Sequence, residues 1–138
     1  MGKKLLFLCT GNSCRSQMAE GIARTLFPKD IIVESAGTEA HGLNPIAIRV
    51  MDDISISISN HQSTRISDKK IHEFDMLITL CGDAKDKCPV LEPNTEHIHW
   101  GIEDPAIFKG DEDEIYMKYQ EVRDIIFKKI SDFKKGLE

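Results

Sequence analysis

The residues with the clearest chemical potential lie in segment 9–16, Cys-Thr-Gly-Asn-Ser-Cys-Arg-Ser, which follows an apolar run and precedes a helical pattern. A thiol at the end of a strand, before a short turn and a helix N-terminus, lies where backbone N–H groups point inward and the helix dipole is positive. This field and the guanidinium group of Arg15 favour the thiolate form of Cys9. The segment therefore predicts a nucleophile, Cys9, beneath an oxyanion-binding loop formed by Thr10, Gly11, Asn12, Ser13, Cys14, Arg15 and Ser16.

Arg15 and Ser16 distinguish this segment from an ordinary strand-to-helix turn that happens to bury a cysteine. The planar guanidinium group of Arg15 suits bidentate binding of a tetrahedral oxyanion. A hydroxyl group from Ser13 or Ser16 can bond the cysteine sulfur or cap the helix. No Gly-Lys-Ser/Thr sequence follows, so the segment is not a Walker A loop and nucleotide hydrolysis is disfavoured.

Hydrophobic periodicity predicts strands that alternate with helices along the chain. Short apolar runs predict strands at residues 4–9, 31–33, 76–80 and 96–100. Apolar residues at helical spacing predict helices at residues 16–27, after an Asn44 N-cap, at 67–72 and from 111 onward. Residues 54–59 alternate Ile with Ser, which taken alone predicts a half-buried strand.

This order of elements predicts an α/β fold, a three-layer sandwich with a four-stranded parallel sheet flanked by helices on both faces. In such sheets ligands bind at the carboxyl ends of the strands. Cys9 ends the first strand, Cys81 follows the third, and Asp104 follows the fourth. We therefore expect residues far apart in the sequence to converge at one edge of a single domain, residues 1–138.

Composition limits the classes of function. The chain has 138 residues, a formal net charge of −5 and four cysteines. The negative charge argues against nucleic acid or an anionic membrane as a partner. No export signal or transmembrane stretch is evident, so we expect a cytoplasmic protein whose cysteines are reduced and catalytic or metal-binding rather than paired in structural disulfides.

The segment 9–16 resembles the loop of the low-molecular-weight protein tyrosine phosphatase superfamily, which has the form Cys-x5-Arg-Ser near the N-terminus. Three further stretches resemble the thioredoxin-coupled arsenate reductases within that superfamily. They are residues 79–84 (Thr-Leu-Cys-Gly-Asp-Ala) with 87–89 (Lys-Cys-Pro), residues 99–105 (His-Trp-Gly-Ile-Glu-Asp-Pro), and residues 59–63 (Ser-Asn-His-Gln-Ser). The resemblance covers essentially the whole chain, and the superfamily has a loop rather than a strand at residues 54–59.

The resemblance implies a catalytic set of Cys9, Cys81, Cys88, Arg15 and Asp104. Cys9 would attack arsenate, Cys81 would attack the Cys9 sulfur as arsenite leaves, and Cys88 would take over the disulfide, which thioredoxin then reduces. Asp104, before Pro105, would be the general acid that protonates the leaving oxygen. The implied role is arsenic detoxification by a protein that we expect to be monomeric.

Two other functions stay open. A phosphatase that hydrolyses phosphoesters through a Cys9 phosphocysteine needs only Cys9, Arg15 and Asp104, and has no use for Cys81 and Cys88. A thiol redox sensor or arsenical-binding module without turnover is the more distant alternative. Oxidation of Cys9 with Cys14 to a disulfide would inactivate the protein, whether it is a reductase or a phosphatase.

The sequence provides little support for a metal. Cys81 and Cys88 lack a second ligand pair at zinc-finger spacing, and His97 and His99 are typical of an ordinary strand pair. The potassium-site residues of the family are matched in part by Asn12, Glu20 and Ser35. Thr64 stands where that pattern more often has a carboxylate, so the sequence leaves potassium open. We expect no other bound cofactor.

Overall fold

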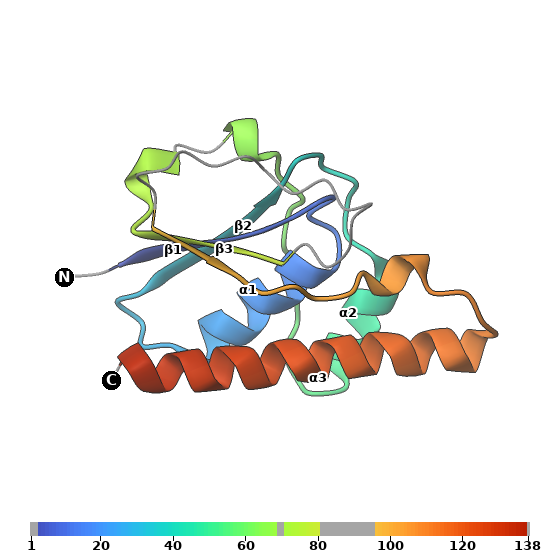
Figure 1. Ribbon diagram of the computed structural model, residues 1–138. Coiled ribbons are helices and arrows are strands. Elements are labelled where there is room, and N and C mark those ends of the chain that lie inside the picture. Colours follow the sequence, from blue (N-terminus) through green and yellow to red (C-terminus); the bar gives the residue numbers. More distant parts are fainter. Residues whose placement is uncertain (1–2, 69–70, 81–95, 138) are drawn as a thin grey trace.

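The computed structural model describes residues 3–68, 71–80 and 96–137, and a four-stranded parallel sheet lies at its centre (Figure 1). The strands are β1 (Lys4–Cys9), β2 (Ile32–Gly37), β3 (Met76–Thr79) and β4 (His97–His99), in the spatial order β2-β1-β3-β4. β1 occupies a central position because it pairs with β2 on one side, ending at Cys9 opposite Gly37, and with β3 on the other. The carboxyl ends of β1 and β3 therefore lie side by side.

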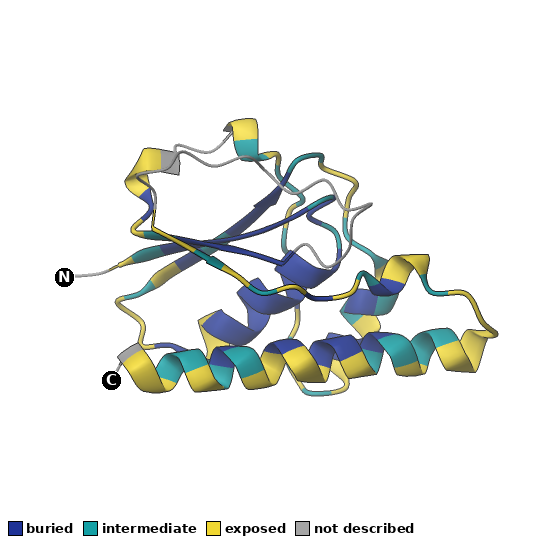
Figure 2. Cartoon of the chain, viewed as in Figure 1, coloured by how far each residue is buried: buried dark blue, intermediate teal, exposed yellow. Residues whose placement is uncertain are grey.

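The three α-helices of the described chain pack on one face of the sheet (Figure 1). They are α1 (Arg15–Leu26), α2 (Pro45–Asp52) and α3 (Glu112–Leu137). Side chains alternate along β1, so Leu5, Phe7 and Cys9 point into the core shared with these helices. The long helix α3 contributes Tyr119, Val122, Ile126 and Ile130, spaced as one buried stripe (Figure 2).

The opposite face of the sheet has a smaller apolar cluster. Leu6 and Leu8 of β1 pack there with Leu77 and with Phe74 and Ile66. The last two residues belong to the segment with two short 3₁₀ helices, η1 (Ile66–Asp68) and η2 (Ile71–Glu73). Helical segments thus cover both faces of a four-stranded parallel sheet, and the expected fold class is confirmed.

Local sequence signals explain where two helices begin. The Asn44 side chain accepts hydrogen bonds from the backbone N–H groups of Ile46 and Ala47, and Pro45 occupies the first helical position of α2. The first turn of α3 is acidic and its last turn contains lysines, which matches the helix dipole at both ends. In the part of the chain that the structure describes, no helix is long and apolar enough to span a membrane.

The strand that alternation alone predicts at residues 54–59 is wrong, and the loop that the resemblance implies is confirmed. Ser55 has a φ of 63°, in the left-handed region, which an extended strand does not allow. The amides of Ser55 and Ile56 instead bond back to the carbonyls of Asp52 and Met51 at the end of α2. The isoleucines still point inward, with Ile58 fully buried, so the alternation predicts burial correctly and backbone pairing incorrectly.

Candidate active site

The loop between β1 and α1 is held from outside by the segment 38–44. Three loop carbonyls accept backbone hydrogen bonds of 2.9 Å from it: Thr10 from Glu39, Gly11 from His41, and Ser13 from Asn44. In a trans peptide the N–H group of the following residue points opposite to the carbonyl. The N–H groups of Gly11, Asn12 and Cys14 therefore point toward the inner side of the loop, an arrangement suited to an anion.

Cys9 lies at the floor of this loop, with its side chain buried. Its sulfur is 2.8 Å from the hydroxyl oxygen of Ser16, in the first turn of α1. The amide nitrogen of Asn12 donates to that same hydroxyl oxygen over 2.8 Å. Because Ser16 accepts from Asn12, its own proton is available to the sulfur, where it would stabilise a thiolate. Asn12 reaches this position with a φ of 48°, a left-handed conformation that asparagine tolerates.

Arg15 connects the loop to the carboxyl ends of the other strands. Its side chain is buried, and Nη1 donates to the carbonyl oxygens of Leu80 at 3.1 Å and Ile102 at 2.9 Å. Nη2 lies 3.5 Å from Oδ2 of Asp104. The structure thus brings together two of the predicted site residues, Arg15 and Asp104, whose positions in the sequence are far apart.

Asp104 is fixed by the turn that follows it. It is the N-cap of the short 3₁₀ helix η3 (Pro105–Ile107), and its Oδ1 accepts a hydrogen bond of 2.9 Å from the amide of Ala106. Pro105 sets the backbone at the first position of this turn. The other carboxylate oxygen, Oδ2, is the one that lies 3.5 Å from Nη2 of Arg15.

Cys14, the second thiol of the loop, lacks the lowered pKa that is typical of a reactive cysteine. Burial raises the pKa of Cys14 well above its ordinary value, and the charges of Asp104 and Cys9 raise it further, while Arg15 lowers it. The neighbouring Tyr119 of α3 has its pKa raised to about 12, mainly by burial. Cys14 therefore stays protonated at neutral pH and fills space between the loop and α3.

A polar network lies behind the loop, on the side away from Arg15. Oε1 of Glu20 accepts a hydrogen bond of 2.6 Å from the Ser35 hydroxyl, and Ser35 in turn accepts one of 3.0 Å from the Asn12 amide nitrogen. Arg24 approaches Oε2 of Glu20 at 3.1 Å, and His61 Nδ1 lies 3.5 Å from the same oxygen. We call Asn12, Ser35, Glu20, Arg24 and His61 the rear network.

Gln17 joins the rear network to the loop. Its amide nitrogen donates to the backbone and side-chain oxygens of Asn12, each over 3.1 Å, and its Oε1 lies 3.0 Å from Nδ1 of His61. Neither Gln17 nor Arg24 is among the site residues predicted from the sequence. Their signal was present, because positions 17, 20, 21 and 24 share one face of a helix and three of them are polar.

The residues that partly match the potassium site of the family do not fit a cation here. Oδ1 of Asn12 already accepts from the Thr64 amide at 2.7 Å and from Gln17, and Asn12 directs its amide nitrogen at Ser35. Both carboxylate oxygens of Glu20 are engaged, one by Ser35 and one by the guanidinium group of Arg24. A hard cation needs oxygen lone pairs, and a guanidinium group at this position would repel it.

The remaining predicted residues fall into two groups. Cys81 and Cys88 lie outside the described residues. His97 and His99 both point to one side of β4 and contact the Thr79 hydroxyl oxygen, at 2.9 Å and 2.6 Å. No group of three potential metal ligands occurs within residues 3–68, 71–80 and 96–137.

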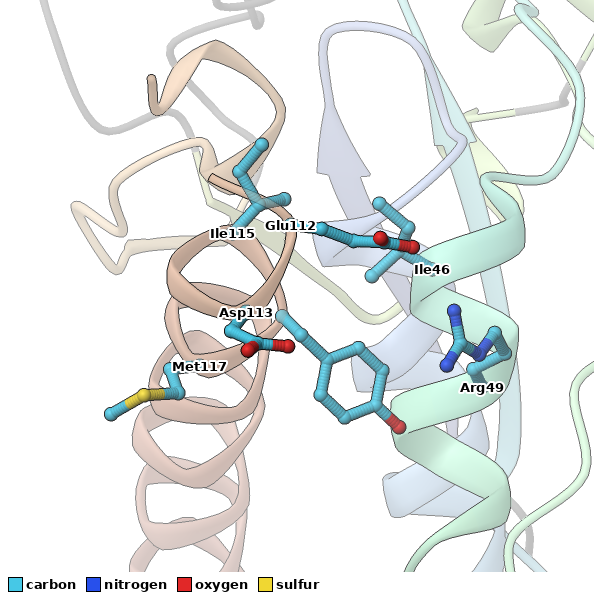
Figure 3. Close-up of a pocket in the computed structure, with 7 residues that line it drawn as sticks. Ile46, Arg49, Glu112, Asp113, Ile115 and Met117 are labelled. Carbon is cyan, nitrogen blue, oxygen red and sulfur yellow. The ribbon is translucent and has the colours of Figure 1, made fainter. Parts of the chain in front are cut away.

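A separate pocket of about 710 Å³ lies between α2 and the start of α3 (Figure 3). Ile46 and Arg49 of α2 line one side of it, and Ile115 and Met117 of α3 line the other. The Arg49 guanidinium group lies 4.8 Å from the centre of the Tyr116 ring. This pocket does not include the loop of residues 9–16.

The parallel sheet, the buried cysteine at the end of its first strand and the arginine beside the loop together match a phosphatase-like fold. Residues 4–138 match the family model described as low molecular weight phosphotyrosine protein phosphatase, and the chain belongs to this family.

The relatives of this chain include proteins named arsenate reductase. The one from Oceanobacillus iheyensis is 50% identical over 136 residues, which cover 98% of each chain. The one from Bacillus subtilis strain 168 is 48% identical and covers 95% of this chain and 94% of its own. A solved structure described as an arsenate reductase in the phosphate binding state matches with a TM-score of 0.81 and 33% identity, over 99% of both chains.

Proposed function

We propose that this protein is an arsenate reductase that converts arsenate to arsenite with three of its cysteines. The observation that carries the proposal is the position of the buried Cys9 sulfur, at the floor of a loop that Arg15 closes against the ends of two other strands. Arsenate is a tetrahedral oxyanion of the size and charge that such a loop binds. The names of the relatives support the same substrate.

The first step is nucleophilic. The Cys9 thiolate attacks the arsenic of bound arsenate, a sulfur–arsenic bond forms, and one oxygen leaves as water after it is protonated. The loop amides and Arg15 hold the negative charge of the remaining oxygens. Asp104 is the general acid in this step, since its carboxyl group lies beside Arg15, the residue that binds the anion. Arsenic is still in its pentavalent state in this adduct.

The second step is the reduction. The Cys81 thiolate attacks the Cys9 sulfur, a disulfide forms, and the electron pair of the sulfur–arsenic bond stays with arsenic, which leaves as trivalent arsenite. Two thiols have then supplied two electrons. The carbonyl oxygen of Leu80 lies 3.1 Å from Nη1 of Arg15. Cys81 is the next residue in the sequence, and this peptide link to Leu80 favours Cys81 as the attacking thiol.

The third step regenerates the nucleophile. The Cys88 thiolate attacks the Cys81 sulfur, Cys9 leaves as a thiolate, and a Cys81 to Cys88 disulfide remains. Thioredoxin reduces this disulfide and returns the enzyme to its starting state. Because each cycle requires reduced thiols, the reaction takes place in the cytoplasm, where thiols are kept reduced. Its role is arsenic detoxification.

The test is a coupled assay in which NADPH consumption is followed with arsenate, thioredoxin and thioredoxin reductase. Arsenate-dependent NADPH oxidation that stops when thioredoxin is omitted supports the proposal. A parallel assay of phosphoester hydrolysis is the control for the phosphatase function that Cys9, Arg15 and Asp104 alone would allow. Hydrolysis without any arsenate-dependent NADPH oxidation would refute the proposal and favour a phosphatase.

A further inference from the structure

Glu20 is a carboxylate in an unusual place, directly behind the catalytic loop and almost completely buried. Its side chain is 9% exposed, whereas that of its partner Arg24 is 53% exposed. A buried carboxylate is costly unless a cation and hydrogen bonds compensate it. Arg24 is well placed to do so, because its guanidinium group is also anchored by two hydrogen bonds, of 3.1 Å and 3.0 Å, to the Val33 carbonyl of β2.

The second group near Oε2 of Glu20 is His61, which lies 3.5 Å from that oxygen. Burial lowers the pKa of His61 below its ordinary value, so the imidazole is neutral at physiological pH. Its Nδ1 faces the Oε1 acceptor of Gln17 and therefore carries the ring proton. Of the described contacts of Glu20, the one with Arg24 is then the contact that supplies positive charge.

The hydrogen bonds that start at Glu20 have a defined direction. Glu20 can only accept, so the Ser35 hydroxyl donates to it and is left with lone pairs for the Asn12 amide nitrogen. Asn12 donates its other proton to Ser16. Ser16 then has its hydroxyl proton free for the Cys9 sulfur, 2.8 Å away. The carboxylate of Glu20 thus orients every donor in a continuous path that ends at the nucleophile.

We propose that Arg24 is a positioning residue for the nucleophile, which takes the place of a bound cation by compensating Glu20 and so keeps the Ser16 hydroxyl directed at Cys9. The described hydrogen bonds and ion pair of Arg24 are with Val33 and Glu20, so its effect on Cys9 passes through Glu20, Ser35, Asn12 and Ser16 in turn. The inference rests on the proposed function only in treating Cys9 as the nucleophile. It adds a role for Arg24, an exposed residue of α1 four positions after Glu20, in orienting that nucleophile.

The test compares Arg24→Ala and Arg24→Lys with the control Arg49→Ala. Arg49 is an exposed arginine on α2 that has no contact with the rear network in the described structure. The measured quantity is the rate of Cys9 alkylation by iodoacetamide as a function of pH, with peptide mapping to assign the modified cysteine. No arsenate is needed, so this result is independent of whether the protein turns over arsenate.

Arg24→Ala should slow alkylation at neutral pH by about threefold to tenfold, which is the size of a typical net hydrogen-bond contribution. Its pH profile should move to higher pH, while Arg24→Lys and Arg49→Ala should keep the profile of the wild type. Guanidinium ion at millimolar, non-denaturing concentration should restore the rate of Arg24→Ala, and the same concentration of sodium chloride should not. An unchanged profile in Arg24→Ala would overturn the proposal, even if its thermal unfolding midpoint falls.

A double-mutant cycle separates positioning from simple stabilisation. Glu20→Gln keeps an oxygen acceptor for Ser35 but removes the charge that needs compensation. In the Glu20→Gln background, Arg24→Ala should have no further effect on the pH profile of alkylation, because the two residues act in one path. Equal effects of Arg24→Ala in the two backgrounds would contradict the proposed path. Thermal unfolding and circular dichroism of each variant check that the fold is intact.

Discussion

Arg15 and Asp104 form a contact of 3.5 Å between a buried guanidinium group and a carboxylate at the surface of the site, across 89 positions of sequence. The arginine also bonds two backbone carbonyls, which fix the plane of its guanidinium group. It is therefore preorganised, with its direction set before any anion arrives. Preorganised donors of this kind are effective because they need not reorient during the reaction.

Arg15→Lys should abolish most of the activity although it preserves the charge. A lysine ammonium group is a point charge that cannot span the carbonyls of Leu80 and Ile102 while it binds two oxygens of one anion. We expect a loss of about 100-fold or more in kcat/KM, comparable to the loss of an oxyanion-hole donor. Steady-state kinetics with Arg49→Lys as the control checks this, and near-normal activity of Arg15→Lys would show that a point charge is sufficient.

Tetrahedral anions should compete for the loop before any chemistry occurs. Phosphate, sulfate and arsenate should each slow alkylation of Cys9, because the inward amides and Arg15 recognise the shape and charge shared by all three. Chloride at equal ionic strength is the control for screening. Alkylation rates that are the same with and without these anions would mean that the loop is not an anion site.

Gly37→Ala should damage the loop from the neighbouring strand. A Cβ atom at Gly37 would lie 2.6 Å from the Thr10 carbonyl oxygen and 2.7 Å from the Asn12 nitrogen, which are backbone atoms that cannot move independently. We expect a loss of about 1–3 kcal/mol in the free energy of unfolding, as for other overpacked sites, together with weaker phosphate protection of Cys9. Gly136→Ala is the matched control, since a Cβ there meets nothing within 4 Å. Equal stability of the two variants in urea unfolding would be inconsistent with this packing.

His61 should make stability depend on pH in the weakly acidic range. Because burial lowers the pKa of His61, the unfolded chain binds a proton at this residue more readily than the folded one does. Its contribution is fully present above the unfolded value of about 6.5 and is lost as pH falls below it, toward the lower folded value. Urea unfolding of the wild type and of His61→Gln, at neutral pH and at a pH about one unit below that unfolded value, isolates the effect. The wild type should lose more stability between these conditions than His61→Gln, and an equal or smaller loss would contradict the prediction.

The convergence of the loop with Asp104 could be predicted from the sequence because it follows from topology. Carboxyl ends of parallel strands meet at one edge, so a cysteine that ends β1 and an aspartate that follows β4 are brought together by the sheet. The N-cap at Asn44 was also predictable, because that signal is local.

The rear network could not be predicted in the same way. It depends on the approach of His61 and Thr64, which belong to a loop without periodicity, to α1 and to β2. The polar spacing of Gln17, Glu20 and Arg24 could have indicated a buried polar face, but not which strand would receive it. For residues 54–59, alternation predicted the inward side chains while the chain lacked a strand to pair with.

The proposed mechanism requires three cysteines to act in a fixed order. This order is tested by a single-turnover assay of arsenite release, combined with mass mapping of the disulfides. Cys88→Ser should release one arsenite per enzyme and stop as a Cys9 to Cys81 disulfide, whereas Cys81→Ser and Cys9→Ser should release none. Cys14→Ser, the control that removes the protonated thiol of the loop, should keep cycling with thioredoxin. Sustained thioredoxin-coupled turnover by both Cys81→Ser and Cys88→Ser would contradict the relay and the reductase function built on it.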